Sequence, residues 1–310
     1  MLKVLFVCSG NNNSDISPIV KAQANTLVKK DINIEFYPIK GKGLSGYIYN
    51  FFLLRKFLKG NHYDLVHAHY GLSAIAATFA GANPLVVSLM GSDVKLGGCQ
   101  LYVIRFFARY IWGATIVKSL EMADIIGKNH VQIIPNGVDT KLFCPINSQK
   151  ARTTLGLKPE KTYLLFASDP ERPEKNFYLT KKAIEKIGIN NLGLLILKNI
   201  PYSLVPLYLN ASDVIIISSK WEGSPNSIKE AMACNRPIVS TDVGDVRRVI
   251  NNIDGCFISS FNPEDMAEKV KMALDFGNKT EGRKRINELG LDSETIAEKL
   301  FKLYKKVLEN

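Results

Sequence analysis

The sequence predicts an α/β protein made of two similar domains, each with a parallel β-sheet that helices cover on both faces. A length of 310 residues is enough for two domains of ordinary size, and 46% hydrophobic with 22% charged residues is the balance of a globular chain. Short continuous apolar runs alternate with amphipathic segments along both halves, which is typical of strands buried on both sides. Two such units in succession predict two Rossmann-like domains, 1–150 and 151–310.

The apolar runs of the first half predict its strands. These runs lie at 2–8, 32–37, 64–68, 85–89, 114–118 and 131–134. A helix is expected over 17–30, because Ser17 is a suitable N-cap and Pro18 takes the first helical position. Each run is short and unbroken, so the six strands are expected to lie inside one sheet.

The second half repeats the pattern and then becomes helical. Its apolar runs lie at 163–167, 193–197, 214–218, 237–241 and 256–259. Helices are expected over 263–276 and 293–308, and the last of them is expected to pack back across a cleft between the domains. The polar, punctuated segment 140–158 marks the boundary between the two halves.

Composition narrows the class of protein. No stretch of about 18 uncharged apolar residues occurs, so no membrane-spanning helix is predicted, and the N-terminal MLKVLFVCSG reads as a strand and loop rather than a signal peptide. The five cysteines are scattered without CxxC spacing. Neither a disulfide framework nor a zinc site is indicated, and a cytoplasmic location is expected.

The net charge of +11 is unevenly divided, with +8 over 1–150 and +3 over 151–310. A basic first half indicates an anionic partner, either phosphate-bearing molecules or a membrane surface, although ordinary solubilising lysines explain the charge equally well. No helix-turn-helix, zinc or RNA-recognition signature accompanies it, so no nucleic-acid partner is predicted.

The segment 222–230, EGSPNSIKE, follows the strand expected at 214–218. Parallel sheets bind ligands at the carboxyl ends of their strands. Ser224 is expected to cap the next helix and Pro225 to occupy its first position. The backbone N–H groups from Asn226 onward would then be free to bind an anion or hydroxyl groups.

Two glutamates bracket this turn. Glu222 precedes the expected cap and can accept hydrogen bonds from neutral hydroxyls, while Gly223 allows the loop to approach a ligand closely. Glu230 lies six residues beyond the cap, roughly 9 Å along the helix. Carboxylates so far apart suit a ligand with two polyol ends, such as a sugar and a ribose.

Five segments in order along the chain resemble family 4 of the retaining glycosyltransferases, which have the GT-B fold. The hallmark is Glu, seven residues, Glu, followed by Ala-Met-Ala, as in EGSPNSIKEAMA. The other segments are SGNNN (9–13), DLVHAHYGLSA (64–74), VSLMGSDVK (87–95) and IPNGVDTKLF (134–143). The N-terminal part looks closest to transferases of surface-polysaccharide and teichuronic-acid assembly.

The resemblance implies roles for the second-half residues. Glu222 would bond the donor sugar's hydroxyls, the 223–226 backbone would hold the sugar and diphosphate, and Glu230 would hold the ribose. Arg172 and Lys175, in FASDPERPEKNF, would neutralise the leaving diphosphate. The family's spacing is Arg, four residues, Lys; here Arg172 comes only three positions before Lys175, so Lys175 is the firmer assignment.

The first-half residues that the resemblance singles out lie on two loops. Gly10 and Asn11 would approach the diphosphate, although consecutive asparagines are also a common turn composition. Ser92 and Asp93 would lie at the mouth of the cleft. Many relatives have His where this sequence has Met90. The change removes a polar contact to the sugar, so the identity of the donor and an inactive member of the family both stay open.

Two further features stay open at this level. His67 and His69 alternate at the end of a strand, where one could reach the cleft or both could pack in the core. The segments 47–59 and 100–112 mix aromatic and aliphatic residues with Arg or Lys, as interfacial helices do, or they pack on the first sheet.

The leading hypothesis is a retaining, metal-independent transferase that moves a sugar from a UDP- or GDP-linked donor to a lipid-linked or polysaccharide acceptor. The sequence has no Asp-x-Asp pair, so no catalytic metal and no further cofactor is expected. Residues 198–202 are expected to frame the base. The protein would work at the inner face of the plasma membrane, in peripheral contact with anionic lipid. The alternatives are a nucleoside-diphosphate-sugar epimerase of the same fold, or a non-catalytic partner that binds sugar nucleotide or membrane.

Overall fold

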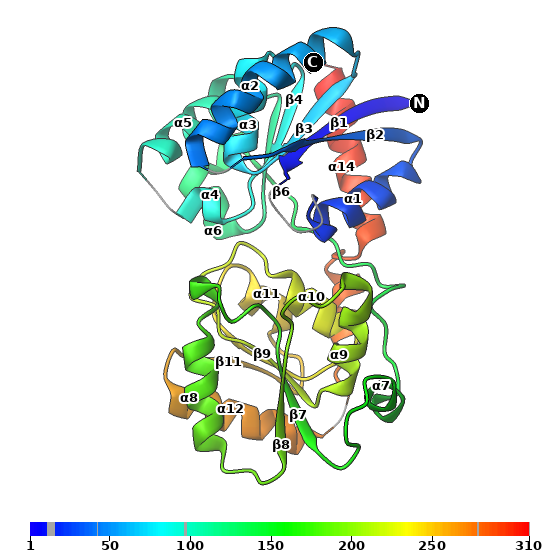
Figure 1. Ribbon diagram of the computed structural model, residues 1–310, viewed down its shortest axis with the longest axis vertical. Coiled ribbons are helices and arrows are strands. Elements are labelled where there is room, and N and C mark those ends of the chain that lie inside the picture. The colour runs from blue at the N-terminus through cyan, green and yellow to red at the C-terminus, as the bar shows by residue number, and fades with distance from the viewer. Residues whose placement is uncertain (11–15, 42, 96–97, 278, 310) are drawn as a thin grey trace. The chain divides into compact units, whose positions relative to one another are not determined.

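The computed structural model describes residues 1–10, 16–41, 43–95, 98–277 and 279–309. The chain forms two compact units, each with its own parallel sheet (Figure 1). Unit 1 is Met1–Asn136 together with Ser293–Asn310, and unit 2 is Gly137–Asp292. The division therefore falls before the expected 150/151, because Val138 and Phe143 are buried in the core of unit 2.

The sheet of unit 1 has six parallel strands in the order β2-β1-β3-β4-β5-β6. All six predicted strands are confirmed, within two residues at each end. Their bounds are β1 (Leu2–Ser9), β2 (Ile32–Ile39), β3 (Leu65–His69), β4 (Leu85–Ser88), β5 (Ala114–Val117) and β6 (Gln132–Ile133).

Helices cover both faces of this sheet (Figure 1). Those of unit 1 are α1 (Pro18–Val28), α2 (Gly43–Gly60), α3 (Gly71–Ala80), α4 (Ser92–Lys95), α5 (Gly98–Tyr110), α6 (Leu120–Ile126), η1 (Lys128–His130) and α14 (Ser293–Leu308). Helix α1 begins at Pro18 as predicted, although the Ser17 side chain makes no capping hydrogen bond.

Alternation along β1 shows how the two faces are filled. Val4 and Phe6 lie in the core shared with α1 and α14, whereas Leu5 and Val7 lie in the core shared with α2, α3, α5 and α6. Both sets are fully buried. This is why the strands read as continuous apolar runs instead of alternating ones.

Helix α14 belongs to unit 1 although it ends the described chain. Tyr304 is fully buried against the sheet, and its hydroxyl lies 2.5 Å from Nδ1 of His67. Lys29 and Lys30, after α1, pair with Glu294 and Glu298 of α14 at 3.1 and 3.0 Å. The helix thus completes one face of the first sheet.

The sheet of unit 2 has five parallel strands in the order β11-β10-β9-β7-β8. All five predicted strands are confirmed. Their bounds are β7 (Thr162–Phe166), β8 (Leu192–Ile196), β9 (Val214–Ile217), β10 (Ile238–Thr241) and β11 (Cys256–Ser259).

Helices also cover both faces of the second sheet, α8 and α12 on one and α9, α10, α11 and α13 on the other. Helix α12 has the bounds that the sequence predicts. The helices are α7 (Ser148–Thr154), η2 (Pro173–Lys175), α8 (Phe177–Ile187), η3 (Tyr202–Leu204), α9 (Val205–Ala211), α10 (Asn226–Ala233), α11 (Val246–Ile250), α12 (Pro263–Phe276) and α13 (Gly282–Glu288).

Strand order reverses once in each sheet. In unit 1 the reversal lies between β1 and β3, and in unit 2 it lies between β7 and β9. In open parallel sheets, ligands bind outside the carboxyl ends of the strands at such a reversal. Each unit therefore has one position in which a ligand site is expected.

None of the helices in the described ranges has both the length and the apolar composition that a bilayer crossing requires. The prediction from composition was the same.

Replacing Tyr304 should destabilise unit 1. We expect Tyr304→Ala to lower its free energy of unfolding by about 3–5 kcal/mol, because a fully buried ring is lost. Tyr304→Phe should cost about 1–3 kcal/mol, since it leaves a buried His67 nitrogen without its partner. Urea unfolding followed by the fluorescence of Trp112 in a Trp221→Phe background would report on unit 1.

Lys302→Ala provides the matched control, because Lys302 is an exposed residue of the same helix. Its effect should stay within about 0.5 kcal/mol. Equal losses for Lys302→Ala and Tyr304→Ala would contradict the assignment of α14 to the core of unit 1.

Candidate functional site

The strand reversal in unit 2 brings a lysine and a glutamate together. Lys175 lies on the loop after β7, and Glu222 lies on the loop after β9. Their side chains form an ion pair through Glu222 Oε1, and both are largely buried, with 14% and 16% exposure. Ser219 Oγ donates a second hydrogen bond to the same oxygen at 2.8 Å. Among the described residues nothing bonds Oε2, which is therefore available to a ligand hydroxyl.

Ser218 fixes the loop that carries Lys175. Its hydroxyl contacts the carbonyl oxygens of Lys175 and Asn176, each at 3.0 Å, and Thr180 Oγ1 donates to it at 2.9 Å. Both Ser218 and Thr180 are buried. The end of β9 thus holds the loop after β7 in place, a role that sequence reasoning did not assign.

Arg172 is placed differently from Lys175. Its side chain is 56% exposed, and its Nε donates to Glu174 Oε1 at 2.8 Å. Lys175, and not Arg172, joins Glu222. The roles assigned to Lys175 and Arg172 stay predictions.

The turn before α10 differs from the expectation. The helix begins at Asn226 with Pro225 as its N-cap, and no side chain caps it. Ser224 was expected to cap; instead its hydroxyl donates to Asp245 Oδ2 at 2.7 Å. Ser224 lies one residue before the N-cap, and its hydroxyl is left to donate to the buried carboxylate of Asp245. Among the described residues, no side chain accepts from the amide groups of the first turn, as an anion site requires.

A second glycine, Gly244, shapes this turn. A Cβ added to Gly244 would lie 2.4 Å from the carbonyl oxygen of Gly223 and 2.9 Å from that of Glu222, and its φ is +60°. Only glycine allows the loop after β10 to close on residues 222–223. The sequence offered a signal in TDVGD (241–245), which sequence reasoning left unassigned.

Glu230 lies on α10, 7% exposed. Tyr202 donates its hydroxyl to Glu230 Oε1 at 2.8 Å, and burial raises the pKa of Glu230 to about 7. Burial also raises the pKa of Tyr202, so the phenol keeps its proton and acts as the donor. Tyr202 ends the 198–202 segment expected to frame the base, and it orients the carboxyl group proposed to meet the ribose.

Unit 1 has a cavity of about 350 Å³ at its own strand reversal. It lies at the carboxyl ends of β1, β3 and β4. The predicted residue Ser92 and the residue Met90 are both in its wall. The lining is Cys8, Ser9, Ser17, Val20, His69, Tyr70, Met90 and Ser92.

Asp93 holds the loops beside this cavity. Its carboxylate accepts hydrogen bonds from the backbone N–H groups of Gly71 at 2.9 Å, Gly91 at 2.9 Å and Met90 at 3.0 Å. The side chain is buried, and that burial raises its pKa against the opposing effect of these hydrogen bonds. Asp93 thus positions Met90 and Ser92, and its oxygens are occupied by backbone.

The predicted residues at the end of β1 are only partly described. The N–H group of Gly10 donates to the carbonyl of Ile39 at 2.8 Å, and a Cβ there would lie 2.8 Å from Pro38 Cβ. Glycine is therefore needed for the close packing of β1 on β2. Asn11 lies outside the described residues.

The two histidines have different surroundings. His67 is fully buried between Tyr304 and Ser88, whose hydroxyl is 2.9 Å from Nε2, so it is a core residue. His69 is 3% exposed and lines the cavity of unit 1. Its Nε2 has no hydrogen-bond partner among the described residues. Burial lowers the pKa of His69 to about 3, which keeps the ring neutral.

The described side chains form no candidate metal site. Within the ranges that the structure describes, no group of three or more His, Cys, Asp or Glu side chains is arranged to hold a metal ion. Metal independence stays a prediction for experiment.

The sequences of α2 and α5 left open whether these helices pack on the sheet or are interfacial. In the structure each of them has two apolar faces, one packed on the sheet and one exposed. Leu54 and Ile104 are fully buried against the sheet. An exposed aromatic surface remains on the other side, made of Ile48, Tyr49, Phe52 and Leu53 of α2, Phe79 of α3, and Tyr102, Val103, Phe106 and Tyr110 of α5.

Ring contacts make this aromatic surface continuous. Phe51 contacts Phe52 and Phe79, Phe79 contacts Phe107, and Phe107 contacts Phe106, with ring centroids 4.5–6.5 Å apart. The contacts run from α2 through α3 to α5. The surface is therefore one patch and not a set of scattered side chains.

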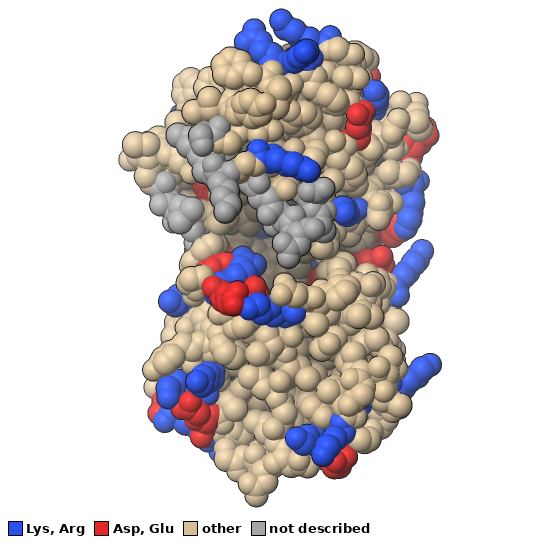
Figure 2. Space-filling model, viewed as in Figure 1, with Lys and Arg blue, Asp and Glu red and all other residues tan. Residues whose placement is uncertain are grey.

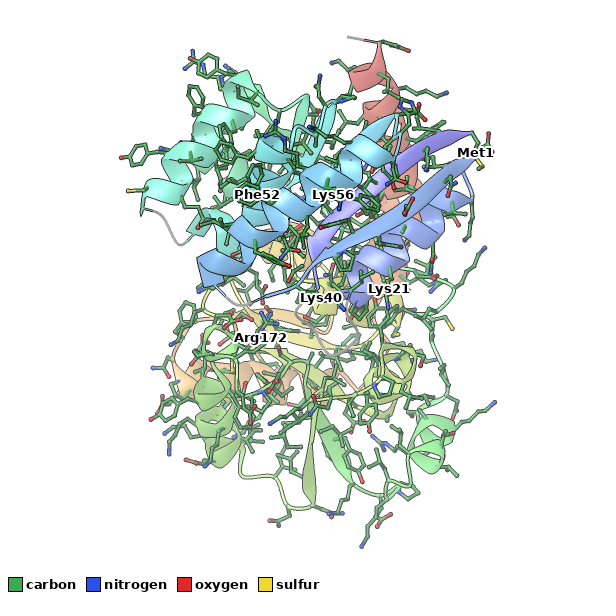
Figure 3. All side chains as sticks on the ribbon, turned by 45° about the horizontal axis from the view of Figure 1, so that its top comes forward. Met1, Lys21, Lys40, Phe52, Lys56 and Arg172 are labelled. Carbon is green, nitrogen blue, oxygen red and sulfur yellow. The ribbon has the colours of Figure 1, made fainter. Side chains whose placement is uncertain are left out.

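Exposed cations accompany the patch. Figure 3 labels Phe52 and Lys56, which lie one helical turn apart on α2. Arg55 and Lys59 are exposed on the same helix, as are Arg105 and Arg109 on α5. Neither helix sequence contains Asp or Glu. On the face in Figure 2, Lys and Arg (blue) lie in separate groups, several of them beside Asp or Glu (red), unlike the continuous basic track of many nucleic-acid-binding surfaces.

Two family models match the chain. The model described as Glycosyltransferase Family 4 matches residues 17–142, and the model described as Glycosyl transferases group 1 matches residues 158–275.

Curated relatives agree with these matches. TuaC of Bacillus subtilis (strain 168), whose name assigns it to teichuronic acid biosynthesis as a glycosyltransferase, is 25% identical over 67% of this chain and 60% of its own length. The UDP-Gal:alpha-D-GlcNAc-diphosphoundecaprenol alpha-1,3-galactosyltransferase of Escherichia coli is 28% identical over 66% of this chain and 65% of its own. The chain thus spans less than two thirds of the length of these relatives.

Solved structures agree on the fold. Sucrose-phosphate synthase from Thermosynechococcus elongatus matches with a TM-score of 0.81 at 16% identity, over 100% of both chains. HepE of Anabaena in complex with UDP matches with a TM-score of 0.72 at 16% identity, over 98% of this chain and 100% of its own. The predicted GT-B fold is confirmed.

The raised pKa of Glu230 predicts a pH-dependent stability of unit 2. The unfolded carboxyl group loses its proton near 4.5 and the folded one near 7, so the folded state binds more protons in between. The free energy of unfolding should therefore fall as pH rises from 4.5 to 7, by about 3 kcal/mol. Urea unfolding at pH 5 and pH 8, followed by Trp221 in a Trp112→Phe background, would measure it.

Glu230→Gln is the matched control. Its amide oxygen can still accept from Tyr202, yet the side chain stays neutral at both pH values. An equally steep pH dependence in Glu230→Gln would show that another group is responsible.

Proposed function

We propose that this chain, whose first half matches the model described as Glycosyltransferase Family 4 and whose second half matches Glycosyl transferases group 1, is a retaining, metal-independent transferase. It moves a sugar from a nucleoside-diphosphate donor to a lipid-linked glycan acceptor in surface-polysaccharide assembly. The observation that carries the proposal is the Lys175–Glu222 pair at the strand reversal of unit 2, beside the uncapped start of α10.

The chemistry of transfer fits these groups. The bond between the sugar's anomeric carbon and the diphosphate oxygen breaks, and negative charge builds on the departing oxygen. The Lys175 ammonium and the first N–H groups of α10 stabilise that charge. The acceptor oxygen bonds to the same face of the anomeric carbon, and its proton passes to the leaving phosphate. Retention without a protein nucleophile requires this front-face course.

Glu222 and Glu230 bind the two polyol ends of the donor. Glu222 Oε1 is engaged by Lys175 and Ser219, which leaves Oε2 to accept from a sugar hydroxyl. Glu230 Oε1 is engaged by Tyr202, which leaves its other oxygen for a ribose hydroxyl. Each carboxyl group is therefore held by one oxygen and offers the other to the ligand.

The acceptor is proposed to bind to unit 1, at the cavity lined by Ser92 and Met90. Two relatives are named as transferases acting on diphospho-undecaprenol-linked sugars. A lipid-linked acceptor places the enzyme at a membrane surface, which the aromatic surface of α2 and α5 can contact. Its Phe, Tyr and Arg/Lys composition is that of a segment lying at the lipid–water interface.

An epimerase of the same fold is the second candidate. It would need acid and base groups around the sugar, and the fully buried Lys229, beside Glu230, is the group in unit 2 that favours it. Burial lowers the pKa of Lys229. The acids Asp245, Glu230 and Glu222 attract its charge through space, so the simpler role is that of an internal charge partner.

Nucleotide binding tests the proposal. In calorimetry with EDTA present, the protein should bind the nucleoside diphosphates and nucleotide sugars of one base family. Glu230→Ala should weaken nucleotide binding at least tenfold, because a ribose acceptor is lost. With the donor identified in this way, Lys175→Ala and Glu222→Gln should lower transfer by at least about 100-fold, the loss typical when a charge-stabilising group is removed.

Circular dichroism would verify that these variants are folded, and Lys181→Ala, a change of an exposed lysine in unit 2, is the control. Near-normal transfer by folded Lys175→Ala would remove Lys175 from the mechanism. Binding without transfer, joined by epimer formation from the bound donor, would favour the second candidate.

Membrane contact predicts a second, separate result. Sedimentation with vesicles rich in phosphatidylglycerol should capture the wild type more than neutral vesicles do, and high salt should weaken the capture. Replacing Phe52 and Phe106 together by Ser should lower binding at least tenfold, because both rings are exposed and apolar.

Tyr178→Ser is the control, since Tyr178 is an equally exposed aromatic residue on α8 of unit 2. If the double variant sediments with anionic vesicles as well as the Tyr178 variant does, the aromatic surface is not the membrane contact.

A further inference from the structure

Unit 2 contains a cavity of about 590 Å³ at the amino ends of its strands, which is the end of the sheet opposite the Lys175–Glu222 pair. Its wall includes Thr162, with which β7 begins, and Asp213 and Pro237, which directly precede β9 and β10. The carboxyl and amino ends of β7 are roughly 13 Å apart at about 3.3 Å per residue. The amino-end cavity is therefore separate from the donor site.

Arg236 is one of two buried arginines in its wall. The residue is 8% exposed, and its Nη2 donates to the carbonyl oxygen of Ser212. Its Nε is buried and has no hydrogen-bond partner among the described residues. A guanidinium has five N–H groups, and a buried charge is costly unless its groups are paired. Arg236 thus has donors to spare inside the cavity wall.

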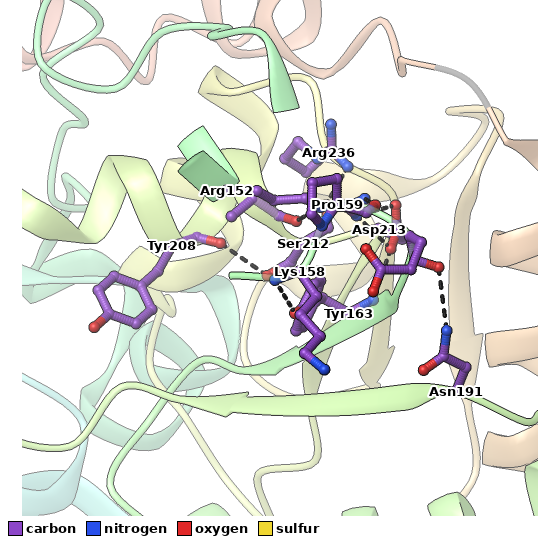
Figure 4. Close-up of polar contacts among 11 residues, drawn as sticks. Arg152, Lys158, Pro159, Tyr163, Asn191, Tyr208, Ser212, Asp213 and Arg236 are labelled. Carbon is purple, nitrogen blue, oxygen red and sulfur yellow. Dashed lines mark hydrogen bonds and ion pairs between the residues drawn. The ribbon is translucent and has the colours of Figure 1, made fainter. Parts of the chain in front are cut away.

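The nearest acidic group is already engaged. Asp213 accepts two hydrogen bonds from Arg152 Nη2, at 2.7 and 2.8 Å, and one from the N–H group of Tyr163 at 2.7 Å (Figure 4). Nε and Nη1 of Arg152 donate to the carbonyl oxygens of Ala211 and Pro159, each at 2.9 Å. Asp213 attracts Arg236 through space, but among the described residues its hydrogen bonds go to Arg152 and Tyr163.

The rim of the cavity adds further positive charge. Lys161 and Lys279 line it, and no ion pair joins either of them to another described residue. Glu160 is the other acidic residue in the wall. Four cationic side chains therefore face two acidic ones, and one of the two acids is neutralised by Arg152.

We propose that the amino-end cavity binds a small phosphate-bearing molecule, with Arg236 and the two rim lysines as its anion contacts. The volume accommodates a phosphate group with a small organic part attached, since ligand cavities commonly span about 300–1,000 Å³. The bound anion supplies the acceptor oxygens that Arg236 lacks. Binding also stabilises unit 2, because the site is formed only when β7, β9 and β10 are folded. The site does not depend on the proposed transferase activity.

The test uses the full chain carrying Lys175→Ala, so that phosphate loses the lysine contact at the donor site. Inorganic phosphate and glucose 6-phosphate are titrated by calorimetry at constant ionic strength, with glucose as the uncharged comparison. We expect saturable binding of at least one phosphate probe and none of glucose. Tighter binding of glucose 6-phosphate than of inorganic phosphate identifies a phosphorylated organic ligand, and equal binding identifies the free anion.

Variants then locate the binding. Arg236→Gln and the double change Lys161→Ala/Lys279→Ala should each weaken phosphate binding at least tenfold. The double change remains informative where Arg236→Gln fails to fold, because both lysines are at the rim. Lys181→Ala/Lys271→Ala removes the same charge from exposed positions of α8 and α12 and should bind as the parent does.

Two results would overturn the proposal. One is the absence of saturable phosphate binding up to tens of millimolar. The other is equal weakening in the rim variant and in the control variant, which would mean that phosphate responds only to the overall charge of unit 2.

Discussion

The burial of both faces of each sheet is the constraint on which the rest of the structure depends. Once helices cover both faces, a parallel sheet can meet a ligand only at the ends of its strands. Loops from neighbouring strands can then supply side chains to one point only where the strand order reverses. Lys175 and Glu222 illustrate this, because they are 47 residues apart in sequence and form an ion pair at that point in unit 2.

The charged groups at these strand ends use only part of their hydrogen-bonding capacity within the protein. In unit 2, Glu222 and Glu230 are each held by one oxygen, through Lys175 and Tyr202, and the start of α10 has no side-chain cap. A fully paired network would be more stable but would offer a ligand nothing, because an incoming hydroxyl group would have to displace an existing partner. The raised pKa of Glu230 is one cost of this arrangement.

The fold could be predicted from sequence because its signal is local. Continuous apolar runs locate all eleven strands of the described chain, and α12 and α14 end where their patterns end. The division between units was misplaced because the polar segment after Asn136 gives no sign that Phe143 is buried in the second core.

The site could be predicted only where one segment carries it. Glu222, Glu230 and Lys175 stand in short motifs, whereas the Ser224–Asp245 and Tyr202–Glu230 contacts join residues 21 and 28 positions apart. Those pairings depend on tertiary geometry, which no local pattern encodes. Ser224 shows the consequence: the sequence favours it as a helix cap, but the N-cap is Pro225, and the Ser224 hydroxyl donates to Asp245 instead.

Helices α2 and α5 of unit 1 each have an exposed apolar face besides the one packed on the sheet. A helix that only packs on a sheet needs one apolar stripe, and the second stripe would ordinarily be polar. Here the sheet takes Leu54 and Ile104, while Phe52 and Phe106 stay exposed in one continuous patch with cations and no acids on either helix. Exposed apolar area of this kind is unfavourable in water, so its presence on two helices that already have a buried face argues for contact with an apolar, anionic surface. An acceptor attached to lipid would then be presented to the same unit that holds the cavity at the ends of β1, β3 and β4.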